Sequence, residues 1–296
     1  MHWQKITLVG VGLLGGSLGL AIKQRRLATQ VVGFVRRTAS VTECKKLGVV
    51  DHATRDLRRA VDNADLVILC TPLAQMRELT ERMLPSLKRG ALVTDVGSVK
   101  AGVVKELEPL VAGAGAQFVG SHPMAGTEKT GPSAARADLF EKAVCVLTPT
   151  TRTPVKALRR LEEFWRAVGT HTIQMTPDLH DELVSRSSHL PHLLAAGLAN
   201  YVLDPAHAKE QARLCSTGFR DTTRIASGSP EMWRDIALAN RRNLSLALGT
   251  FIEDLQEFQR ALDAGDARTV EGLFEKAKQR RDDWCAGQAT SSPSLE

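Results

Sequence analysis

Short apolar runs and longer mixed segments alternate along residues 1–175 of the chain. The apolar runs predict strands at residues 6–9, 31–35, 66–70, 92–95, 118–119, 143–147 and 171–175. The segments between them predict helices at residues 17–22, 41–47, 56–63, 75–84 and 154–168. Repeated β–α–β units favour an α/β fold in which helices cover both faces of a mostly parallel, doubly wound sheet.

From residue 176 onwards the pattern changes to consecutive helical segments with few strand signals. Thr176 and Ser229 are each followed by a proline and an acidic residue, a sequence typical of helix starts. Pro191 interrupts the first of these helices and is expected to kink it or split it in two. The helical segments predicted here are 181–203, 229–248, 251–262 and 267–284.

A glycine-rich stretch joins the first predicted strand to the first predicted helix. Its residues are Gly10, Val11, Gly12, Leu13, Leu14 and Gly15, which have the spacing G-x-G-x-x-G. Gly10 permits a tight turn, Gly12 lets the backbone approach a pyrophosphate, and Gly15 lets helix and strand pack closely. The helix N-terminus then presents free N–H groups to the phosphates. The alternative is a turn that uses glycine for steric reasons only.

The glycine motif and the change of pattern together suggest two domains, for which 296 residues are sufficient. We expect a Rossmann-like, dinucleotide-binding domain at residues 1–175 and an all-α domain at residues 176–286. The small and polar residues 287–296 are expected to form a disordered tail.

The second predicted strand ends in Arg36 and Arg37, where an NAD site usually carries an acidic residue for the ribose 2′-hydroxyl. A guanidinium favours a 2′-phosphate, so the sequence favours NADP over NAD. The alternative is that both arginines are solvated and that NAD is also accepted. Thr71 and Pro72 break another strand at its carboxyl end, where doubly wound sheets hold their ligands.

Composition narrows the class of partner. The chain has 43% hydrophobic and 24% charged residues, as ordinary globular proteins do, and a diffuse net charge of +6 that suits acidic small molecules. Aromatic residues are few, at 4%, and we expect no nucleic-acid binding. Five widely spaced cysteines indicate a reducing compartment and no zinc site. We expect neither a signal peptide nor a membrane span, and therefore a cytoplasmic protein.

His122 is the best candidate for a catalytic base. It stands in a glycine-flanked loop after a predicted strand, near the expected nicotinamide end of the sheet. A neutral imidazole accepts a proton near pH 7, because its unperturbed pKa is about 6.5. Such a base would take the proton of a substrate hydroxyl while hydride leaves the carbon that bears it. The alternative is a structural histidine that binds a backbone carbonyl. Ser98 would bond this imidazole or the cofactor amide, or would cap a turn.

Two more clusters lie in the helical half. His189 and His192 are three residues apart beside Pro191, a spacing that can bind metal, but no neighbouring glutamate or cysteine completes a site. Contact with a substrate, or a structural role, is the alternative. Further on, Arg220, Asp221 and Arg224 form an ion pair at the surface, or one of the two arginines clamps a substrate carboxylate. Glu128, six residues after His122, is a candidate partner for such an arginine.

These motifs resemble those of the prephenate/arogenate dehydrogenase family of tyrosine biosynthesis. The resemblance covers residues 5–285 and rests on the glycine turn and on motifs in this order: DVGSVK at 95–100, GSHPMAGTE at 120–128, SHLPH at 188–192, FRDTTRIA at 219–226 and PEMW at 230–233. It implies NAD(P)-dependent oxidative decarboxylation of prephenate to 4-hydroxyphenylpyruvate, or of arogenate to tyrosine. It also implies a homodimer formed through the helical domain.

The resemblance also implies residue roles. His122 would polarise or deprotonate the ring hydroxyl and Ser98 would orient it, while Arg224 would grip a substrate carboxylate. Glu128 and Asp221 would form a gating ion pair with Arg224, and no metal is needed. The residues implied for the substrate site are Thr127, Glu128, Ser188, His189, His192, Asp221, Arg224 and Trp233.

The sequence is also compatible with other substrates and functions. The choice between prephenate, arogenate or both is not fixed by the sequence. A hydroxyacid or imine reductase of similar architecture would use a lysine base, for which no residue is placed as well as His122. A dinucleotide-sensing regulator would not need His122, Ser98 and Arg224 together.

Overall fold

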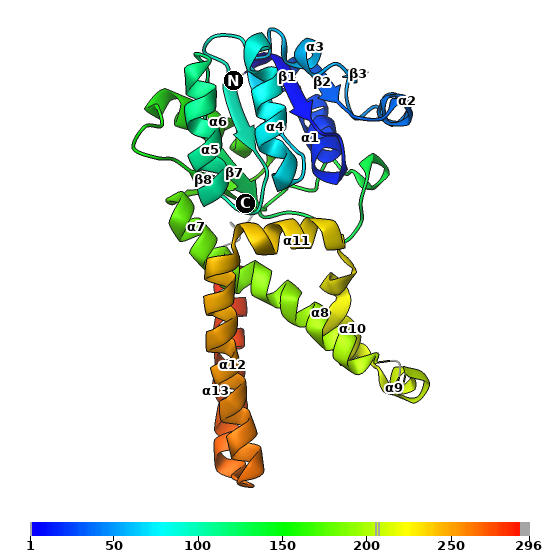
Figure 1. Cartoon of the computed structure of the whole chain (residues 1–296), viewed down its shortest axis with the longest axis vertical. Helices are drawn as coiled ribbons and strands as arrows, with labels where there is room; N and C mark the ends of the chain where they lie inside the picture. The colour runs from blue at the N-terminus through cyan, green and yellow to red at the C-terminus, as the bar shows by residue number, and fades with distance from the viewer. Residues whose placement is uncertain (1, 205, 207, 291–296) are drawn as a thin grey trace. The chain divides into compact units, whose positions relative to one another are not determined.

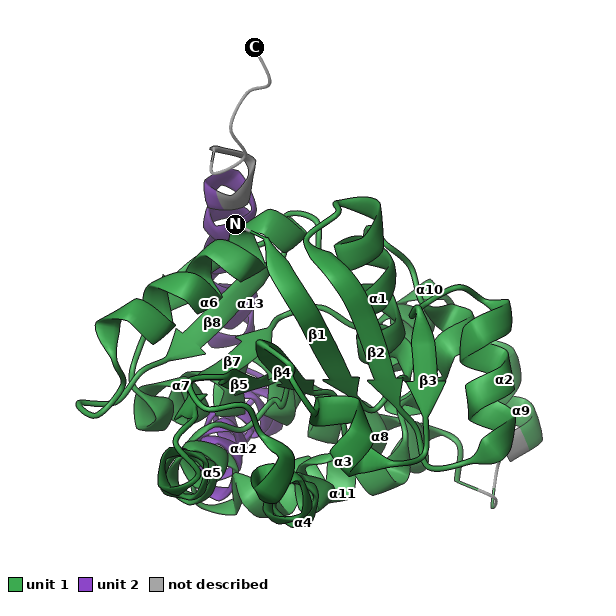
Figure 2. Ribbon diagram, turned by 90° about the horizontal axis from the view of Figure 1, so that it is seen from above, with its two compact units in different colours: residues 1–244 green, residues 245–296 purple. Residues whose placement is uncertain are grey.

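The computed structural model describes residues 2–204, 206 and 208–290. The chain forms two compact units, residues 1–244 and 245–296 (Figure 2). The boundary expected at residue 175 therefore lies inside the first unit, and it stays a prediction. No helix in these described ranges has both the length and the apolar character that crossing a bilayer requires.

The first unit is built on a six-stranded parallel sheet with the strand order β3-β2-β1-β4-β5-β6. The strands are β1 (Trp3–Val9), β2 (Ala28–Phe34), β3 (His52–Thr54), β4 (Leu66–Leu69), β5 (Leu92–Asp95) and β6 (Gln117–Phe118). β2 and β3 follow β1 on one side of it in the sheet, whereas β4, β5 and β6 lie on the other side. The direction of the strand order therefore changes between β1 and β4. In such sheets the ligand crevice lies at this switch point, outside the carboxyl ends of the strands.

Helices cover both faces of this sheet, as its doubly wound pattern predicts (Figure 2). Alternate residues of β1 enter different cores: Ile6 and Leu8 face one, and Val9 faces the other. The first core includes α1 (Leu13–Gln24), α2 (Thr38–Lys46) and α6 (Val155–Val168); the second includes α3 (Leu57–Val61), α4 (Leu73–Met83) and α5 (Ala101–Gly113). Short 3₁₀ turns form at η1 (Leu84–Ser86) and η2 (Pro132–Ala134).

A second, three-stranded sheet corrects the expectation that all strands share one sheet. Its strands are β7 (Gly120–Pro123), β8 (Val144–Thr148) and β9 (His171–Gln174). β7 is antiparallel to β8, and β8 is parallel to β9. The sequence did not reveal β3, β7 or α5. In α5, Gly102, Pro109 and Gly113 weaken the helical signal.

The helices after residue 176 begin where their capping residues predict. Thr176 Oγ1 accepts a hydrogen bond from Leu179 N, and Ser229 Oγ accepts one from Met232 N. The segments are α7 (Pro177–Val184), the π-helical turn η3 (Ser185–His189), α8 (Leu190–Val202), α9 (Ala208–Leu214), α10 (Thr217–Thr223), the 3₁₀ turn η4 (Arg224–Ser227) and α11 (Pro230–Ala239) (Figure 1).

Two expectations about these helices need correction. The irregular turn precedes Pro191, which itself lies in the first turn of α8. The missing N–H of proline is tolerated there. The helix that starts at Ser229 ends at Ala239 and not near residue 248, because Asn240 leaves the helical conformation before α12 (Arg241–Asp263) begins.

The second unit consists of the rest of α12 and of α13 (Ala267–Thr290), joined by a turn in which Gly265 has φ +61°. The rings of Phe258 and Phe274 pack edge to face with their centroids 5.5 Å apart. Because α13 continues to Thr290, the expected tail is wrong for residues 287–290; residues 291–296 lie outside the described part of the chain.

Candidate active site

The glycine turn after β1 has the geometry that its spacing predicts. Gly10 has φ +98°, and a Cβ atom there would lie 2.8 Å from the carbonyl oxygen of Cys70. A Cβ on Gly15 would lie 2.1 Å from the Gly10 carbonyl oxygen, so only glycine fits at both positions. A Cβ on Gly12 would meet nothing within 4 Å, which leaves the backbone open at the N-terminus of α1. Leu13 and Leu14 open that helix.

The end of β4 lies beside this turn and offers an unpaired polar group. Thr71 Oγ1 is buried and has no hydrogen-bond partner among the described residues. Pro72 occupies the N-cap position of α4 but forms no side-chain capping bond. A free hydroxyl next to an open backbone at the switch point fits a bound dinucleotide, so the residues present suit the group that the sequence predicts.

Three arginines gather after β2 and β3. Arg36 and Arg37 are exposed, and neither forms an ion pair within the described ranges. Arg55, which the sequence did not single out, donates from Nε to the Arg36 carbonyl at 3.2 Å and from Nη1 to Thr38 Oγ1 at 3.1 Å. No carboxylate is paired with these guanidinium groups in the part of the chain that the structure describes.

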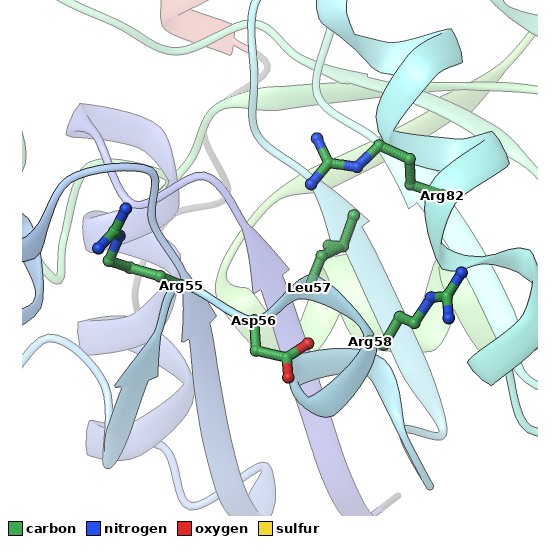
Figure 3. Close-up of a pocket in the computed structure, with 5 residues that line it drawn as sticks. All are labelled: Arg55, Asp56, Leu57, Arg58 and Arg82. Atoms are coloured by element: carbon green, nitrogen blue, oxygen red, sulfur yellow. The ribbon is translucent and has the colours of Figure 1, made fainter.

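A surface pocket of about 570 Å³ lies next to this region, lined by Arg55, Asp56, Leu57, Arg58 and Arg82. Figure 3 shows that its three guanidinium groups do not converge on one point. None of the lining residues belongs to the site that the sequence predicts. This pocket is therefore not the candidate active site.

His122 lies on strand β7, not in a loop, which corrects the expectation from its neighbours. It pairs with Val146 of β8, and the residue after β7, Met124, donates its N–H to the Val144 carbonyl at 2.7 Å. The sequence Gly-Ser-His-Pro lacks the alternation of a strand, so only its partner β8 makes this segment extended. The strand holds His122 with 8% of its surface exposed.

A chain of hydrogen bonds runs from His122 into the first helix of the helical half. Nδ1 of His122 lies 2.9 Å from Nε2 of His180, and Nδ1 of His180 lies 2.7 Å from Oδ1 of Asp181. Asp181 also accepts the backbone N–H of Lys100 at 2.7 Å and of Ala101 at 2.9 Å. The carboxylate therefore caps α5 and supports the histidine pair at the same time.

The surroundings of His122 keep its imidazole neutral. Burial lowers the pKa of His122 well below its usual range, and His180, Lys100 and His189 lower it further. A neutral imidazole has one nitrogen with a free lone pair. His122 is therefore a proton acceptor at neutral pH.

A buried ion pair fixes the position of β7 against the end of β5. The ammonium of Lys100 contacts the carboxylate of Asp95, and both side chains are fully buried. Lys100 Nζ also donates to the Ser121 carbonyl at 3.1 Å, and Asp95 Oδ1 accepts from Ser121 N at 3.3 Å. Ser98, in the turn between these groups, is half-buried, and its hydroxyl forms no hydrogen bond within the described ranges.

His189 closes the π-helical turn and is buried. Its Nδ1 lies 3.2 Å from Nδ2 of Asn240, whereas its Nε2 has no hydrogen-bond partner among the described residues. Burial lowers the pKa of His189 to about 4, although Asp181 and the carbonyl of Ser98 raise it. Asn240 also donates to the Asp181 carbonyl at 2.8 Å, which ties α7 to the break between α11 and α12.

Trp233 of α11 joins the two histidines of the SHLPH motif. His192 stacks on Trp233 with ring centroids 3.7 Å apart, and His189 meets the same ring edge-on at 6.2 Å. The Ser188 carbonyl accepts a hydrogen bond from His192 Nδ1 at 2.9 Å. Burial lowers the pKa of His192, and the guanidinium of Arg224 lowers it further. These contacts join His189, Trp233 and His192, and the charge of Arg224 acts on His192.

Arg224 borders a pocket of about 480 Å³ at the start of η4. Its Nη1 lies 3.2 Å from Oε2 of Glu128, so the pairing expected for these two residues is present. Asp221 is exposed and forms no ion pair in the described part of the chain, so its expected pairing with Arg224 is wrong. Thr127 is exposed, and its Oγ1 accepts from Lys129 N at 3.2 Å. The pocket is lined by Glu128, Cys215, Ser216, Phe219, Arg220, Thr223, Arg224 and Ser227.

Three polar residues of this site were missed by sequence reasoning. His180, Asp181 and Asn240 are buried and hydrogen-bonded around the predicted base. An adjacent His-Asp pair early in a helix is a weak signal that could have drawn attention to two of them. No group of three or more histidine, cysteine, aspartate or glutamate side chains within the described ranges is arranged to hold a metal ion.

Two family models match almost the whole chain. The nucleotide-binding domain of prephenate dehydrogenase matches residues 18–174, and the dimerization domain of prephenate dehydrogenase matches residues 176–279. These matches agree with the parallel sheet and with the helices that follow it.

Individual relatives agree with these models. The chain is 36% identical to the prephenate dehydrogenase of Bacillus subtilis, over 94% of this chain and 75% of that protein. It is 32% identical to the cyclohexadienyl dehydrogenase of Zymomonas mobilis, over 94% of this chain and 95% of that protein. The crystal structure of Aquifex aeolicus prephenate dehydrogenase with hydroxyphenyl propionate and NAD+ has a TM-score of 0.89 at 31% identity, covering 96% of this chain and 99% of that one. The chain therefore belongs to the prephenate dehydrogenase family.

Proposed function

We propose that the protein is an NAD(P)-dependent dehydrogenase that converts prephenate to 4-hydroxyphenylpyruvate in tyrosine biosynthesis. The observation that carries this proposal is the buried, neutral His122 at the end of the hydrogen-bonded chain through His180 to Asp181. Arogenate is the alternative substrate, and an enzyme with broad cyclohexadienyl specificity would accept both. The relatives include one enzyme named prephenate dehydrogenase and one named cyclohexadienyl dehydrogenase.

In the proposed reaction His122 takes the proton of the ring hydroxyl. When bound, the oxidised nicotinamide supplies the acceptor for the hydride that leaves the hydroxyl-bearing ring carbon. The bond to the ring carboxylate breaks, carbon dioxide leaves, and the electron pair of that bond completes the aromatic ring as a phenolate. Aromatisation favours the loss of carbon dioxide, so His122 needs only to hold the proton and return it to the phenolate oxygen. Ser98, in the turn after β5, orients the imidazole or the cofactor amide.

Arg224 is proposed to bind a carboxylate of the substrate. Its side chain is 62% exposed, and the guanidinium has only Glu128 as an ionic partner in the described ranges, so it is free to form a second pair. A guanidinium binds a carboxylate through two parallel hydrogen bonds. Glu128 competes with the substrate for this group and so controls access to it. The stacked rings of His192 and Trp233 are proposed as further substrate contacts, together with Ser188, Thr127 and Asp221.

NADP is the proposed cofactor of choice. Arg36 and Arg37 stand where an acidic residue would select NAD, and Arg55 is anchored beside them by the Arg36 carbonyl. Three cations without a paired carboxylate favour a 2′-phosphate over a 2′-hydroxyl.

A homodimer in the cytoplasm completes the proposal. The second unit exposes large apolar side chains of its own, among them Leu255, Phe274 and Trp284, and the matched family domain is named for dimerization. Exposed apolar surface of this kind marks a protein–protein contact. Sedimentation velocity should give twice the mass of one chain, and a monomer at micromolar concentration would contradict the dimer.

The direct test is absorbance at 340 nm with prephenate or arogenate and NAD or NADP in all four combinations. We expect a rise with prephenate and NADP, together with formation of 4-hydroxyphenylpyruvate. A rise with arogenate alone would reassign the substrate. No rise in any combination, with cofactor binding intact in a titration, would favour a dinucleotide-sensing regulator.

A further inference from the structure

Two buried imidazoles of the site, His122 and His189, differ in their hydrogen bonding: Nδ1 donates a hydrogen bond in His122 and accepts one in His189. A neutral histidine carries its proton on one ring nitrogen only, and its partners decide which one. His122 and His189 each have an Nε2 that forms no hydrogen bond in the described part of the chain. The group bonded to Nδ1 therefore determines what each ring offers to a bound molecule.

The protonation of His122 follows from Asp181. Both oxygens of Asp181 accept backbone N–H groups, so the side chain is a carboxylate and can only accept from His180. Nδ1 of His180 must then carry its proton, which leaves the lone pair of a neutral ring on Nε2. That nitrogen lies 2.9 Å from Nδ1 of His122, which must donate. The lone pair of His122 is thereby placed on Nε2.

The protonation of His189 follows from Asn240. A backbone carbonyl only accepts, so the Asp181 carbonyl, 2.8 Å away, selects the NH₂ group of the Asn240 amide for its side. The amide oxygen faces the other way and accepts from Asn243 Nδ2 at 2.9 Å. The same NH₂ group donates to His189 Nδ1 at 3.2 Å. A neutral His189 therefore has its lone pair on Nδ1 and its proton on Nε2.

We propose that Asp181 and Asn240 are positioning residues that hold His122 and His189 in opposite tautomers. His122 Nε2 then accepts the proton from the substrate, while His189 Nε2 donates a hydrogen bond to an oxygen atom of a bound molecule. The role given to His122 rests on the proposed function; the two tautomers do not. The acceptor oxygen for His189 belongs to a carboxylate of the substrate or to the carboxamide of the cofactor.

The arrangement explains why two similar rings in one site are not interchangeable. An unpaired N–H in a buried position is costly unless a ligand satisfies it. The Nε2 group of His189 is such a donor: the Ser98 backbone is a weak hydrogen-bond partner of the ring that raises its pKa, but no described group meets Nε2 with full hydrogen-bond geometry.

Nuclear magnetic resonance of the enzyme labelled with ¹⁵N-histidine tests the tautomers directly, since protonated and unprotonated ring nitrogens have distinct shifts. The signals are assigned by their loss in His122→Asn and His189→Gln. We expect a bare Nε2 in His122 and a protonated Nε2 in His189, in the full chain without substrate. A protonated Nε2 in His122, or the same tautomer in both rings, would overturn the proposal, whatever the enzyme turns over.

The acceptor of the His189 proton is identified by adding ligands to the same labelled enzyme. NADP alone should shift the His189 Nε2 signal if the cofactor carboxamide is the acceptor. A shift that needs 4-hydroxyphenylpyruvate as well assigns the proton to the side-chain carboxylate, which the product keeps, and a shift seen only with prephenate in the absence of cofactor assigns it to the ring carboxylate. No shift with any of these ligands would overturn the donor role.

Substitution of the positioning residues gives a kinetic test. Asp181 also caps α5, so His180 is varied in its place. His180→Leu removes the acceptor for His122 and should lower kcat by about 10²-fold, whereas the amide oxygen of His180→Gln can still accept and should restore most of the loss. KM for the cofactor should stay unchanged in both. Equal kcat in the two variants would contradict a role through the tautomer of His122.

Asn240→Asp reverses the bond to His189, because a carboxylate can only accept. The proton should move to His189 Nδ1, and KM for the ligand that it contacts should rise by about 2- to 10-fold, as for one lost hydrogen bond. Asn243→Ala is the matched control, since it removes the neighbouring bond but leaves the NH₂ group on His189. An unchanged His189 spectrum in Asn240→Asp, or an equal change in Asn243→Ala, would overturn the role of Asn240.

Discussion

The carboxylate of Glu128 lies 3.2 Å from Nη1 of Arg224, which joins the segment after β7 to the first residue of η4. Both side chains are more than a third exposed. Exposed pairs of this kind contribute only about 0–1 kcal/mol to stability. The pair is therefore weak enough to be exchanged for a pair between Arg224 and a substrate carboxylate.

Neutralising Glu128 tests this exchange. Glu128→Gln removes the anion that competes for Arg224, so KM for prephenate should fall by about 2- to 5-fold with kcat nearly unchanged. Steady-state kinetics at saturating cofactor measure both constants. Glu141→Gln, which breaks the surface pair with Arg25 at 2.8 Å, is the matched control and should leave KM unchanged. A raised KM in Glu128→Gln would instead mean that Glu128 supports the bound conformation of Arg224.

Removing the guanidinium of Arg224 should weaken substrate binding. Hydrogen bonds to charged groups contribute about 1.5–3 kcal/mol, so KM for prephenate in Arg224→Ala should rise by about 10- to 150-fold. Arg220 lines the same pocket, and Arg220→Ala serves as the comparison with a smaller expected effect. If Arg224→Ala changed the unfolding temperature but not KM, the residue would be structural.

His122→Asn isolates the proton-accepting nitrogen. The asparagine amide can still donate to His180, but the side chain has no atom in the place of Nε2. We expect kcat to fall by about 10²–10⁴-fold, with the dissociation constant of the cofactor unchanged. His171→Asn, at the exposed start of β9, should be without effect. Retention of kcat in His122→Asn would remove this residue as the base.

The cofactor preference should depend on the arginines after β2. Arg36→Ala removes one charge from the place expected for a 2′-phosphate, and KM for NADP should rise by about 10-fold or more while KM for NAD changes little. Arg58→Ala removes a charge from the neighbouring pocket and is the control. Equal changes for NADP and NAD in Arg36→Ala would contradict a specific contact with the phosphate.

Stability should fall as the solution becomes acidic. Burial lowers the pKa of His189 from about 6.5 to about 4, so between these values the unfolded chain binds a proton that the folded chain does not. The contribution of this neutral ring is present above about pH 6.5 and is lost as the pH falls towards about 4. Between about pH 7 and pH 5 the loss amounts to about 2 kcal/mol.

Urea unfolding at both pH values measures this loss. His189→Gln keeps an amide in the pocket but has no group that titrates in this range, so its stability should depend less on pH. His171→Gln is the control with an exposed ring. An unchanged pH dependence in His189→Gln would show that the ring does not resist protonation in the folded state.

Local sequence was sufficient for five of the six strands of the parallel sheet and for the glycine turn; β3 was missed. Every predicted strand overlaps an observed one, and those of the six-stranded sheet are marked by apolar runs because a parallel strand is buried on both faces. Only glycine can adopt the positive φ of Gly10 without strain, and only glycine fits at position 15, where a Cβ would lie 2.1 Å from the Gly10 carbonyl oxygen. The two glycines in the sequence therefore indicate this geometry. Thr176 and Ser229 likewise cap the helices that they predict, since capping involves only the next few residues.

The surroundings of His122 were decided by the tertiary structure. Residues 122 and 180 are separated by 58 positions, and Asn240 lies 59 positions from Asp181, so no local pattern connects them. The strand that holds His122 forms only because β8 supplies its hydrogen bonds, and Asp221 lacks the partner that its place in the sequence suggested. The sequence by itself determined which residues are candidates for the chemistry, because residue type and short spacing are local properties. Packing decided which of them meet and which nitrogen bears the proton, because both depend on contacts between distant segments.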